Sequence, residues 1–432
     1  MTGIFEIAEY ILSALKAEGA DAAQCIVSKR KKDELNVDGG KFSLMRSILS
    51  VHISMRAIKD GKKGVISINQ STKEAIDRAA MQCIAAAESS VSDEAVQIAP
   101  FTAKAEYHSG ASKPELDKLF DRTEEFLKQA KNEFPKVSFE QFISDYEYSE
   151  KIYMNTNGTV LKYSHGEYSF NTMFSAHDGT SSSSFNGYSN VFDNLDKPFM
   201  DIGIQRNLLA DSEKQLNTIS VGEKFVGKVI YSPDCFGDLL GTVLSLFAST
   251  GVLVDGSSPW KNSLNKKVAS EQLTLRSIPL DERITVGQRF TPDGYPAENF
   301  DIIKDGVLKA FVLSQYGANK TGFPRSPSSG GNLEVLPGNT PLEEMIKGID
   351  KGLLVNRLSG GRPSSNGDFS AVAKNSFIIE NGKIGPAVSE TMISGNIQDM
   401  LNNIVTISKE QDSDGISFIP WVEFDGVTVS GK

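Results

Sequence analysis

Hydrophobic positions in the first 88 residues switch between helical spacing and the alternation of strands. A first helix ends before Gly19, and its apolar stripe recurs every three or four positions: Ile4, Ile7, Ala8, Ile11, Leu12 and Leu15. Alternating segments predict strands at 23–29, 33–38, 48–58 and 63–69, with Asp60-Gly61 as the turn of a hairpin. Thr72 then caps a second helix with an alanine-rich inner face. Helices separated by antiparallel hairpins indicate an α+β layer.

The middle of the chain predicts one helix followed by a β-meander. Residues 89–104 are small and polar, which is typical of a boundary. A third helix is expected from Ser112 to about Asn132, strong alternation predicts strands from Val137 to Phe192, and residues 201–219 are expected to be helical.

From residue 222 onward, short β segments with frequent Gly and Pro indicate a mostly antiparallel sheet domain, a sandwich or a barrel. A helix is also expected at 341–353. The predicted fold is therefore α+β: an N-terminal α/β layered region with an antiparallel sheet, and a C-terminal β domain with a central helix. The expected regions are 1–100, 105–220 (packed with the first) and 222–432.

The central helix of that last region is the best-defined element. Residues 228–249 predict a strand that turns directly into a helix, with Ser232 as N-cap, Pro233 at the first position and Asp234 complementing the helix dipole. Gly251 is the expected stop. The inner face is apolar: Phe236, Leu239, Leu240, Val243, Leu244 and Phe247. A second row of small residues forms a groove: Gly237, Gly241 and Ser245.

The composition and charge of the chain argue against several classes of function. The chain has 432 residues, a hydrophobic fraction of 39% and a net charge of −10, which disfavours binding along a phosphate backbone. Its 3 cysteines form no CxxC pair, so neither a zinc knuckle nor a disulfide framework is indicated. Charged residues interrupt the first helix, and no apolar run approaches the roughly 20 residues of a membrane span. We expect a cytoplasmic protein that binds neither nucleic acid nor membrane.

Candidate chemistry is sparse. The sequence contains no GxxxxGK[ST] loop, no GxGxxG after a strand and no GxSxG elbow. All 4 histidines precede residue 178: His52, His108, His165 and His177. Nothing in the sequence indicates a Ser-His-Asp triad. Cys235 admits two interpretations, a thiol activated by the helix N-terminus or a small buried residue beside Phe236.

Several segments of the chain resemble the TldD/PmbA family, also called modulators of DNA gyrase. The resemblance is strongest from Gly222 onward, where the order and spacing of the matching pieces are specific. Those pieces are residues 228–249, 300–308, 326–332, 366–370, 379–384, 388–396, 399–400 and 424–431.

The resemblance implies a zinc metallopeptidase frame. TldD-type subunits carry HExxxH on the central helix and a C-terminal Cys, whereas PmbA/TldE-type subunits lack these ligands and pair with the TldD type. In this chain Gly241-Thr242 stand where the His-Glu pair would be, Leu246 where the second His would be, and 413–416 contains no Cys. The resemblance therefore implies no cofactor on this chain and zinc on a TldD-like partner.

The leading hypothesis is a PmbA/TldE-like non-catalytic subunit of a cytoplasmic metallopeptidase that acts on peptides or unfolded segments. It would form a heterodimer with a TldD-like chain, or a homodimer with itself. The candidate cleft or interface residues are Gly241, Thr242, Leu246, Gly330, Gly331, Asn332, Asn366 and Asp368. Two alternatives stay open: a metal-independent hydrolase using Cys235 or a Ser, and a homo-oligomeric binding protein, for example a modulator of DNA gyrase, without proteolysis.

Overall fold

The computed structural model describes residues 3–431 and has a long curved sheet in its N-terminal half. The strand order is β3-β2-β1-β5-β6-β4, with β7 and β8 also paired to β6. The strands are β1 (Ala22–Asp38), β2 (Lys41–Lys59), β3 (Lys62–Ile68), β4 (Lys104–Gly110), β5 (Val137–Asn155), β6 (Val160–Asp178), β7 (Ser181–Ser182) and β8 (Asn186–Phe192). The predicted first and middle regions thus share one sheet, because β1 pairs with both β2 and β5.

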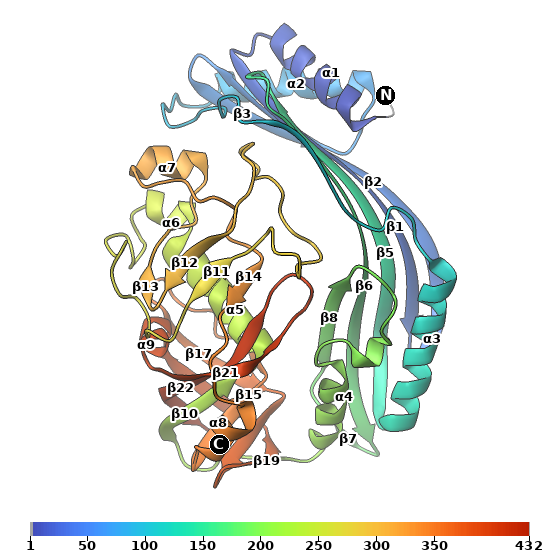
Figure 1. Ribbon diagram of the computed structural model, residues 1–432, viewed down its shortest axis with the longest axis vertical. Coiled ribbons are helices and arrows are strands. Elements are labelled where there is room, and N and C mark those ends of the chain that lie inside the picture. The colour runs from blue at the N-terminus through green and yellow to red at the C-terminus, as the bar shows by residue number, and fades with distance from the viewer. Residues whose placement is uncertain (1–2, 432) are drawn as a thin grey trace.

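Helices cover one face of this sheet, and the other face is turned toward the C-terminal half (Figure 1). The helices of this half are α1 (Ile4–Ala17), α2 (Lys73–Glu88), α3 (Leu116–Glu133), the 3-10 turn η1 (Phe199–Asp201) and α4 (Gln205–Lys214). The apolar stripe of α1 is buried as predicted, together with α2 and the facing residues of β1 and β2. A second, phenylalanine-rich cluster lies under α3, around Phe126 and Phe142.

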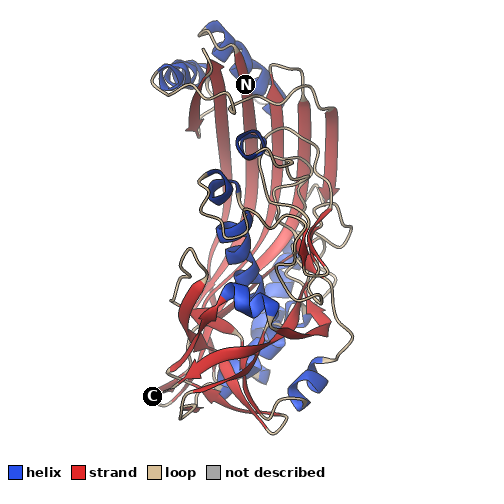
Figure 2. Ribbon diagram, turned by 90° about the vertical axis from the view of Figure 1, so that its left-hand side faces the viewer, coloured by secondary structure: helices blue, strands red, loops and turns tan. Residues whose placement is uncertain are grey.

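The C-terminal half is β-rich, as predicted, and contains two sheets (Figure 2). The larger sheet comprises β9 (Thr218–Ile219), β10 (Phe225–Tyr231), β15 (Lys351–Val355), β16 (Arg357–Ser359), β17 (Asp368–Lys374), β18 (Ser376–Glu380), β19 (Lys383–Val388), β20 (Thr391–Asn396), β21 (Ile404–Asp412) and β22 (Ile419–Ser430). The smaller sheet comprises β11 (Leu275–Ser277), β12 (Phe300–Lys304), β13 (Val307–Leu308) and β14 (Leu333–Val335). The helices are α5 (Pro233–Val243), η2 (Leu244–Ala248), α6 (Thr250–Val254), α7 (Gln315–Thr321), α8 (Leu342–Lys347) and α9 (Ile397–Asn402).

Two local predictions were wrong, and one strand was not predicted. The expected strands 23–29 and 33–38 are one strand, β1. The helix expected at 341–353 is only α8, since the chain ends the helix at Gly348 and enters β15, where both faces are buried. The segment 104–110, for which the sequence predicts no element, is the edge strand β4 and pairs in parallel with β6.

The two halves contact each other near both ends of the N-terminal sheet, and α7 also holds the segment after α2 through an ion pair between Lys320 and Asp93 at 2.9 Å. The loop near Gly294 approaches the inner face of the sheet, where Thr102 Oγ1 donates to Gly294 O at 2.7 Å. At the other end, the Val191 N–H of β8 donates to Asp414 O at 2.9 Å. Among residues 3–431, no helix is long and apolar enough to cross a membrane.

Candidate functional site

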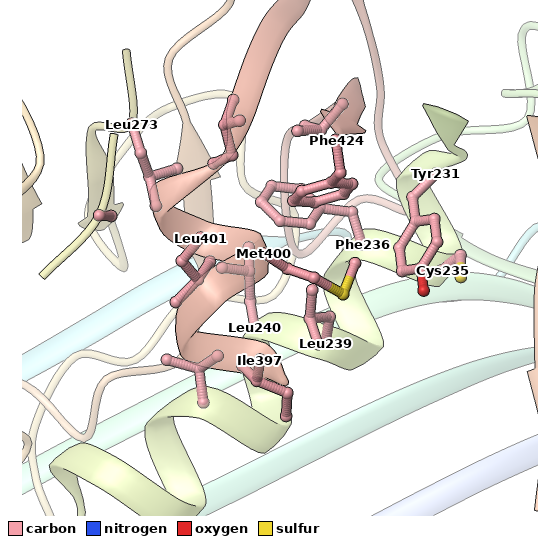
Figure 3. Packing of buried hydrophobic residues seen from close by; sticks show 14 of the residues in the cluster. Tyr231, Cys235, Phe236, Leu239, Leu240, Leu273, Ile397, Met400, Leu401 and Phe424 are labelled. Atoms are coloured by element: carbon pink, nitrogen blue, oxygen red, sulfur yellow. The ribbon is translucent and has the colours of Figure 1, made fainter. Parts of the chain in front are cut away.

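The central helix begins where the sequence predicts. Ser232 Oγ accepts a hydrogen bond from Cys235 N at 3.4 Å, and Pro233 occupies the first turn. Its inner face packs against α9 and β22, with Phe236 and Phe424 in an edge-to-face contact (Figure 3). This packing fixes which side of the helix is turned outward.

The end of the helix differs from the prediction. The α5 hydrogen-bond pattern stops at Val243, a π-helical turn η2 follows, and Ser249 is extended before α6 begins. Gly251 therefore lies inside α6 and does not stop the central helix. π-helical turns are frequently found at functional sites, and this one lies where the family resemblance expects the second metal ligand.

The outward side of α5 presents a row of acidic and small residues. Asp234, Asp238, Gly241 and Ser245 are exposed, and a Cβ atom added at Gly241 would meet no atom within 4 Å. Thr242 is half-buried, and its Oγ1 donates to Asp238 O at 3.0 Å. The predicted groove is thus open at Gly241.

Leu246 lies on η2 and is partly buried against the C-terminal core. Two of the predicted loops meet this same part of the helix. Gly330 lies against Val312, whose N–H donates to Ala248 O, and a Cβ at Gly367 would lie 3.2 Å from Phe247. The structure therefore places both loops beside the end of the central helix.

The polar groups of the loop Gly330–Asn332 form hydrogen bonds with other parts of the C-terminal half. Asn332 has a φ of 50° and donates from Nδ2 to Val286 O at 2.8 Å and Ile416 O at 3.2 Å. Gly331 is exposed, and its carbonyl accepts from Ser277 Oγ at 2.7 Å. Asn332 thus joins this loop to the segment 413–417.

Asn366 and Asp368 form a hydrogen-bonded turn with the cap of α9. Asn366 Nδ2 donates to Asp368 Oδ2 at 2.8 Å, and Asn396 Nδ2 donates to Asp368 Oδ1 at 2.9 Å. These bonds hold the pKa of Asp368 below its ordinary value. Both side chains remain exposed and can still accept bonds from a ligand.

Cys235 is a buried core residue. Its side chain belongs to the main C-terminal cluster (Figure 3). Burial, together with the charges of Asp238 and Asp234, raises the pKa of this thiol well above its ordinary value. A protonated, enclosed thiol is a poor nucleophile, so the structure gives no support to a hydrolase that uses Cys235.

The carboxyl group of Asp412 contacts β8 of the N-terminal half, and its charge also acts on Asp234 at the start of α5. Tyr188 of β8 donates from its hydroxyl to Asp412 Oδ2 at 3.2 Å. Burial chiefly, and the charge of Asp414, raise the pKa of Asp412 to about 6, although bonds from Tyr188 and Ser413 N oppose the shift. The pKa of Asp234 is also raised, by reduced hydration and by its acidic neighbours.

Asp412→Asn is expected to stabilise the protein selectively above pH 6. The folded carboxyl binds its proton more tightly than the unfolded one, so its contribution to stability is complete below about pH 4 and is lost as the pH rises through about 6. The substitution removes a cost of about 2–3 kcal/mol at pH 8 but only about 1 kcal/mol at pH 4.5. Denaturant unfolding at both pH values measures this, with the exposed Asp255→Asn as the control. Equal effects of Asp412→Asn at the two pH values would contradict the assignment.

A cavity of about 840 Å³ lies beside this junction. One wall comes from β8 and the segment leading to α4, and the other from β21 and the loop that follows it. The lining includes Asn190, Gly203, Arg283, Asp412, Phe418 and Trp421. Its volume and mixed lining are typical of a binding pocket. Sequence reasoning missed it because its walls come from segments about 200 residues apart.

The N-terminal sheet also contains an arrangement that sequence reasoning missed. Ser109 Oγ lies 2.6 Å from His165 Nδ1, and His165 Nε2 lies 2.8 Å from Glu167 Oε2. The imidazole is buried, however, and its Nε2 makes no well-directed hydrogen bond. Strand alternation places Tyr163, His165 and Glu167 on one face, but the partner Ser109 comes from the unpredicted strand β4. A buried base without an aligned carboxylate is typical of a structural histidine.

The donor set around α5 does not fit a catalytic zinc ion. Such sites use imidazole, thiolate or carboxylate ligands that converge with one open position. Within residues 3–431, no group of three His, Cys, Asp or Glu side chains is arranged to hold a metal. Asp234 and Asp238 are the acidic groups on the outward face of α5.

The chain has a long curved sheet beside a β-rich domain with a central helix. Two models of one family match the chain: "PmbA/TldA metallopeptidase domain 1" over residues 23–87 and "PmbA/TldA metallopeptidase C-terminal domain" over residues 225–431. Together they cover more than half of the sequence. The chain belongs to the PmbA/TldD family.

Curated relatives support the same assignment. "Metalloprotease PmbA" of Escherichia coli O157:H7 is 32% identical over 211 residues, 48% of this chain and 45% of that protein. A "Metalloprotease PmbA homolog" of Haemophilus influenzae is 27% identical over 271 residues, 60% of this chain and 58% of that protein. The matched stretch thus spans about half the length of these relatives.

A solved structure matches the whole fold. TldE from Thermococcus kodakarensis superposes with a TM-score of 0.83 and 21% identity, covering 98% of this chain and 100% of that one. At this identity the likeness establishes the fold, α+β with curved antiparallel sheets, which confirms the fold class predicted from the sequence.

Proposed function

We propose that this chain is a non-catalytic, PmbA/TldE-like subunit of a cytoplasmic peptidase complex, in which a HExxxH-bearing relative holds the zinc. The observation that carries the proposal is the outward face of α5. Where the resemblance places metal ligands and a general base, this chain has the open Gly241 and the half-buried Thr242 and Leu246. The sequence contains no histidine after residue 177 that could replace them.

The role of such a subunit is to shape a cleft for an extended peptide. The loops at Gly330 and Gly367 lie near the end of the central helix, which supports a cleft formed by this helix and the two loops. Gly331, Asn366 and Asp368 are exposed there and offer backbone and side-chain polar groups to a peptide main chain.

The test compares the purified chain with the complex that it forms when co-expressed with a HExxxH-bearing family member. The chain alone is expected to hold no stoichiometric zinc and to cleave no peptide, whereas the complex does both. Chelator-sensitive cleavage of a peptide by the chain alone would contradict the proposal.

The same assay locates the cleft. Gly241→Phe fills the open groove and is expected to lower peptide cleavage by the complex at least about tenfold, because a displaced peptide loses its reactive alignment. Gly251→Phe is the matched control, since Gly251 is also helical and exposed, and a Cβ atom added there would likewise meet no atom within 4 Å. Equal activity of the two variants would argue against a cleft along α5.

A further inference from the structure

Three cationic side chains gather on the inner face of the N-terminal sheet, the face turned toward the C-terminal half. Lys151 of β5 pairs directly with Tyr163 of β6. Arg30 of β1 pairs with Ser149, so it lies diagonally across from Lys151, at roughly 7–8 Å between Cα atoms. Arg289 comes from the C-terminal half, and its guanidinium carbon lies 5.8 Å from the centre of the Tyr163 ring. Both halves thus contribute to one cationic cluster.

The positive charge of this cluster is poorly balanced by carboxylates. Within residues 3–431, neither Lys151 nor Arg289 has a carboxylate oxygen at ion-pairing distance. Arg30 reaches Glu147 only at 3.6 Å. Burial and the charge of Arg30 lower the pKa of Lys151 below its ordinary value. A bound anion would relieve the repulsion between the cations and favour the charged lysine.

The inner face is closed just beyond the cluster. Phe290 packs on Tyr153, the next inward residue of β5, and Lys151 Nζ lies 5.5 Å from the centre of the Phe290 ring. A Cβ atom added at Gly294 would lie 2.2 Å from the Tyr153 ring, so the loop leaves no space above the strand there. Arg30 lies on the other side of Lys151 and is mostly exposed, so an approach from that side is open.

We propose that Lys151, Arg289 and Arg30 bind the C-terminal carboxylate of a peptide. Guanidinium and ammonium groups bind a carboxylate through charge-assisted hydrogen bonds. If an internal Asp or Glu were bound instead, the peptide main chain would have to continue into the closed end of the face. The stop formed by Phe290 and Gly294 therefore favours a chain terminus. The choice of a peptide as ligand rests on the proposed function, whereas the cationic cluster itself does not.

Peptide binding to the isolated full chain tests this site. The probe is a short alanine–glycine peptide with an uncharged fluorophore at its N-terminus, prepared as the free acid and as the C-terminal amide. Fluorescence anisotropy should show at least about tenfold tighter binding of the acid, because only the acid forms charge-assisted hydrogen bonds with the cluster. This preference should weaken as the salt concentration rises.

Two double variants locate the bound carboxylate. Lys151→Gln/Arg289→Gln should weaken binding of the acid at least about tenfold and leave binding of the amide unchanged, which removes the preference. Lys383→Gln/Arg78→Gln is the matched control, since it also removes one lysine and one arginine, from exposed positions on β19 and α2. This control should keep the preference for the acid. Denaturant unfolding checks that both variants remain folded.

Four results would overturn the proposal: equal affinity for the acid and the amide, binding of an amidated peptide with an internal Glu as tight as that of the acid, displacement of the probe by inorganic phosphate at concentrations where acetate has no effect, or unchanged binding of the acid by Lys151→Gln/Arg289→Gln. The measurements need neither zinc nor a partner chain. A failed peptidase assay therefore leaves the carboxylate site standing, and a failed binding assay leaves the non-catalytic subunit standing.

Discussion

Phe236→Ala is expected to lower the free energy of unfolding by about 3–5 kcal/mol, the usual cost of removing a fully buried phenylalanine ring. Phe236 is 0% exposed and lies between α5 and β22, where its ring contacts that of Phe424 (Figure 3). Denaturant unfolding measures the loss. The effect should be large because this contact joins the central helix to the larger C-terminal sheet.

Phe101→Ala provides the control for that substitution. The Phe101 side chain is 59% exposed, so its removal should change stability by less than about 0.5 kcal/mol. A loss at Phe236 no larger than the loss at Phe101 would mean that the helix is not anchored by its apolar face.

The elements with local signals could be predicted from the sequence. The helix α1 has an unbroken apolar stripe, and the start of α5 has a cap and a proline within two residues, so the positions of both follow from the sequence. The alternation of 137–192 likewise predicted β5, β6 and β8. In each case the residues that define the element lie close together along the chain.

The continuity of β1 depends on residues far along the chain. Its centre is Lys29-Arg-Lys-Lys32, which by itself indicates a solvated strand end. In the structure Lys32 pairs with Asp145 at 3.0 Å, and Arg30 lies 3.6 Å from Glu147, both on the neighbouring β5. Carboxylates from the adjacent strand thus let a basic run continue through the sheet.

The candidate site could likewise be predicted only where it depends on residues that are close together in the sequence. The open groove at Gly241 could be predicted from helical spacing, because it belongs to one helix. The cavity beside Asp412 and the approach of Ser109 to His165 could not, since each joins strands whose neighbours are set by sheet topology. Asn332 illustrates the reverse case: its polar side chain suggested recognition, but its amide joins two loops.

Gly415→Ala is expected to destabilise the junction between the two halves by about 2–4 kcal/mol. Gly415 has a φ of +85°, and an added Cβ would lie 1.9 Å from the carbonyl oxygen of Val191 on β8. The left-handed backbone costs an alanine about 1–2 kcal/mol, and relieving the overlap costs about as much again. The same movement would pull Asp414 O away from its 2.9 Å bond with Val191 N.

Gly415→Ala should uncouple the unfolding of the two halves as well as lower the melting temperature. The N-terminal sheet and the C-terminal half have separate cores, so thermal unfolding of Gly415→Ala should broaden or divide into two transitions. Gly241→Ala is the matched control, because Gly241 is helical with open space around it, and alanine there should be neutral or stabilise by up to about 1 kcal/mol. A single sharp transition at the unchanged temperature for Gly415→Ala would show that other contacts, such as that of Thr102 with Gly294 and that of Lys320 with Asp93, hold the halves together.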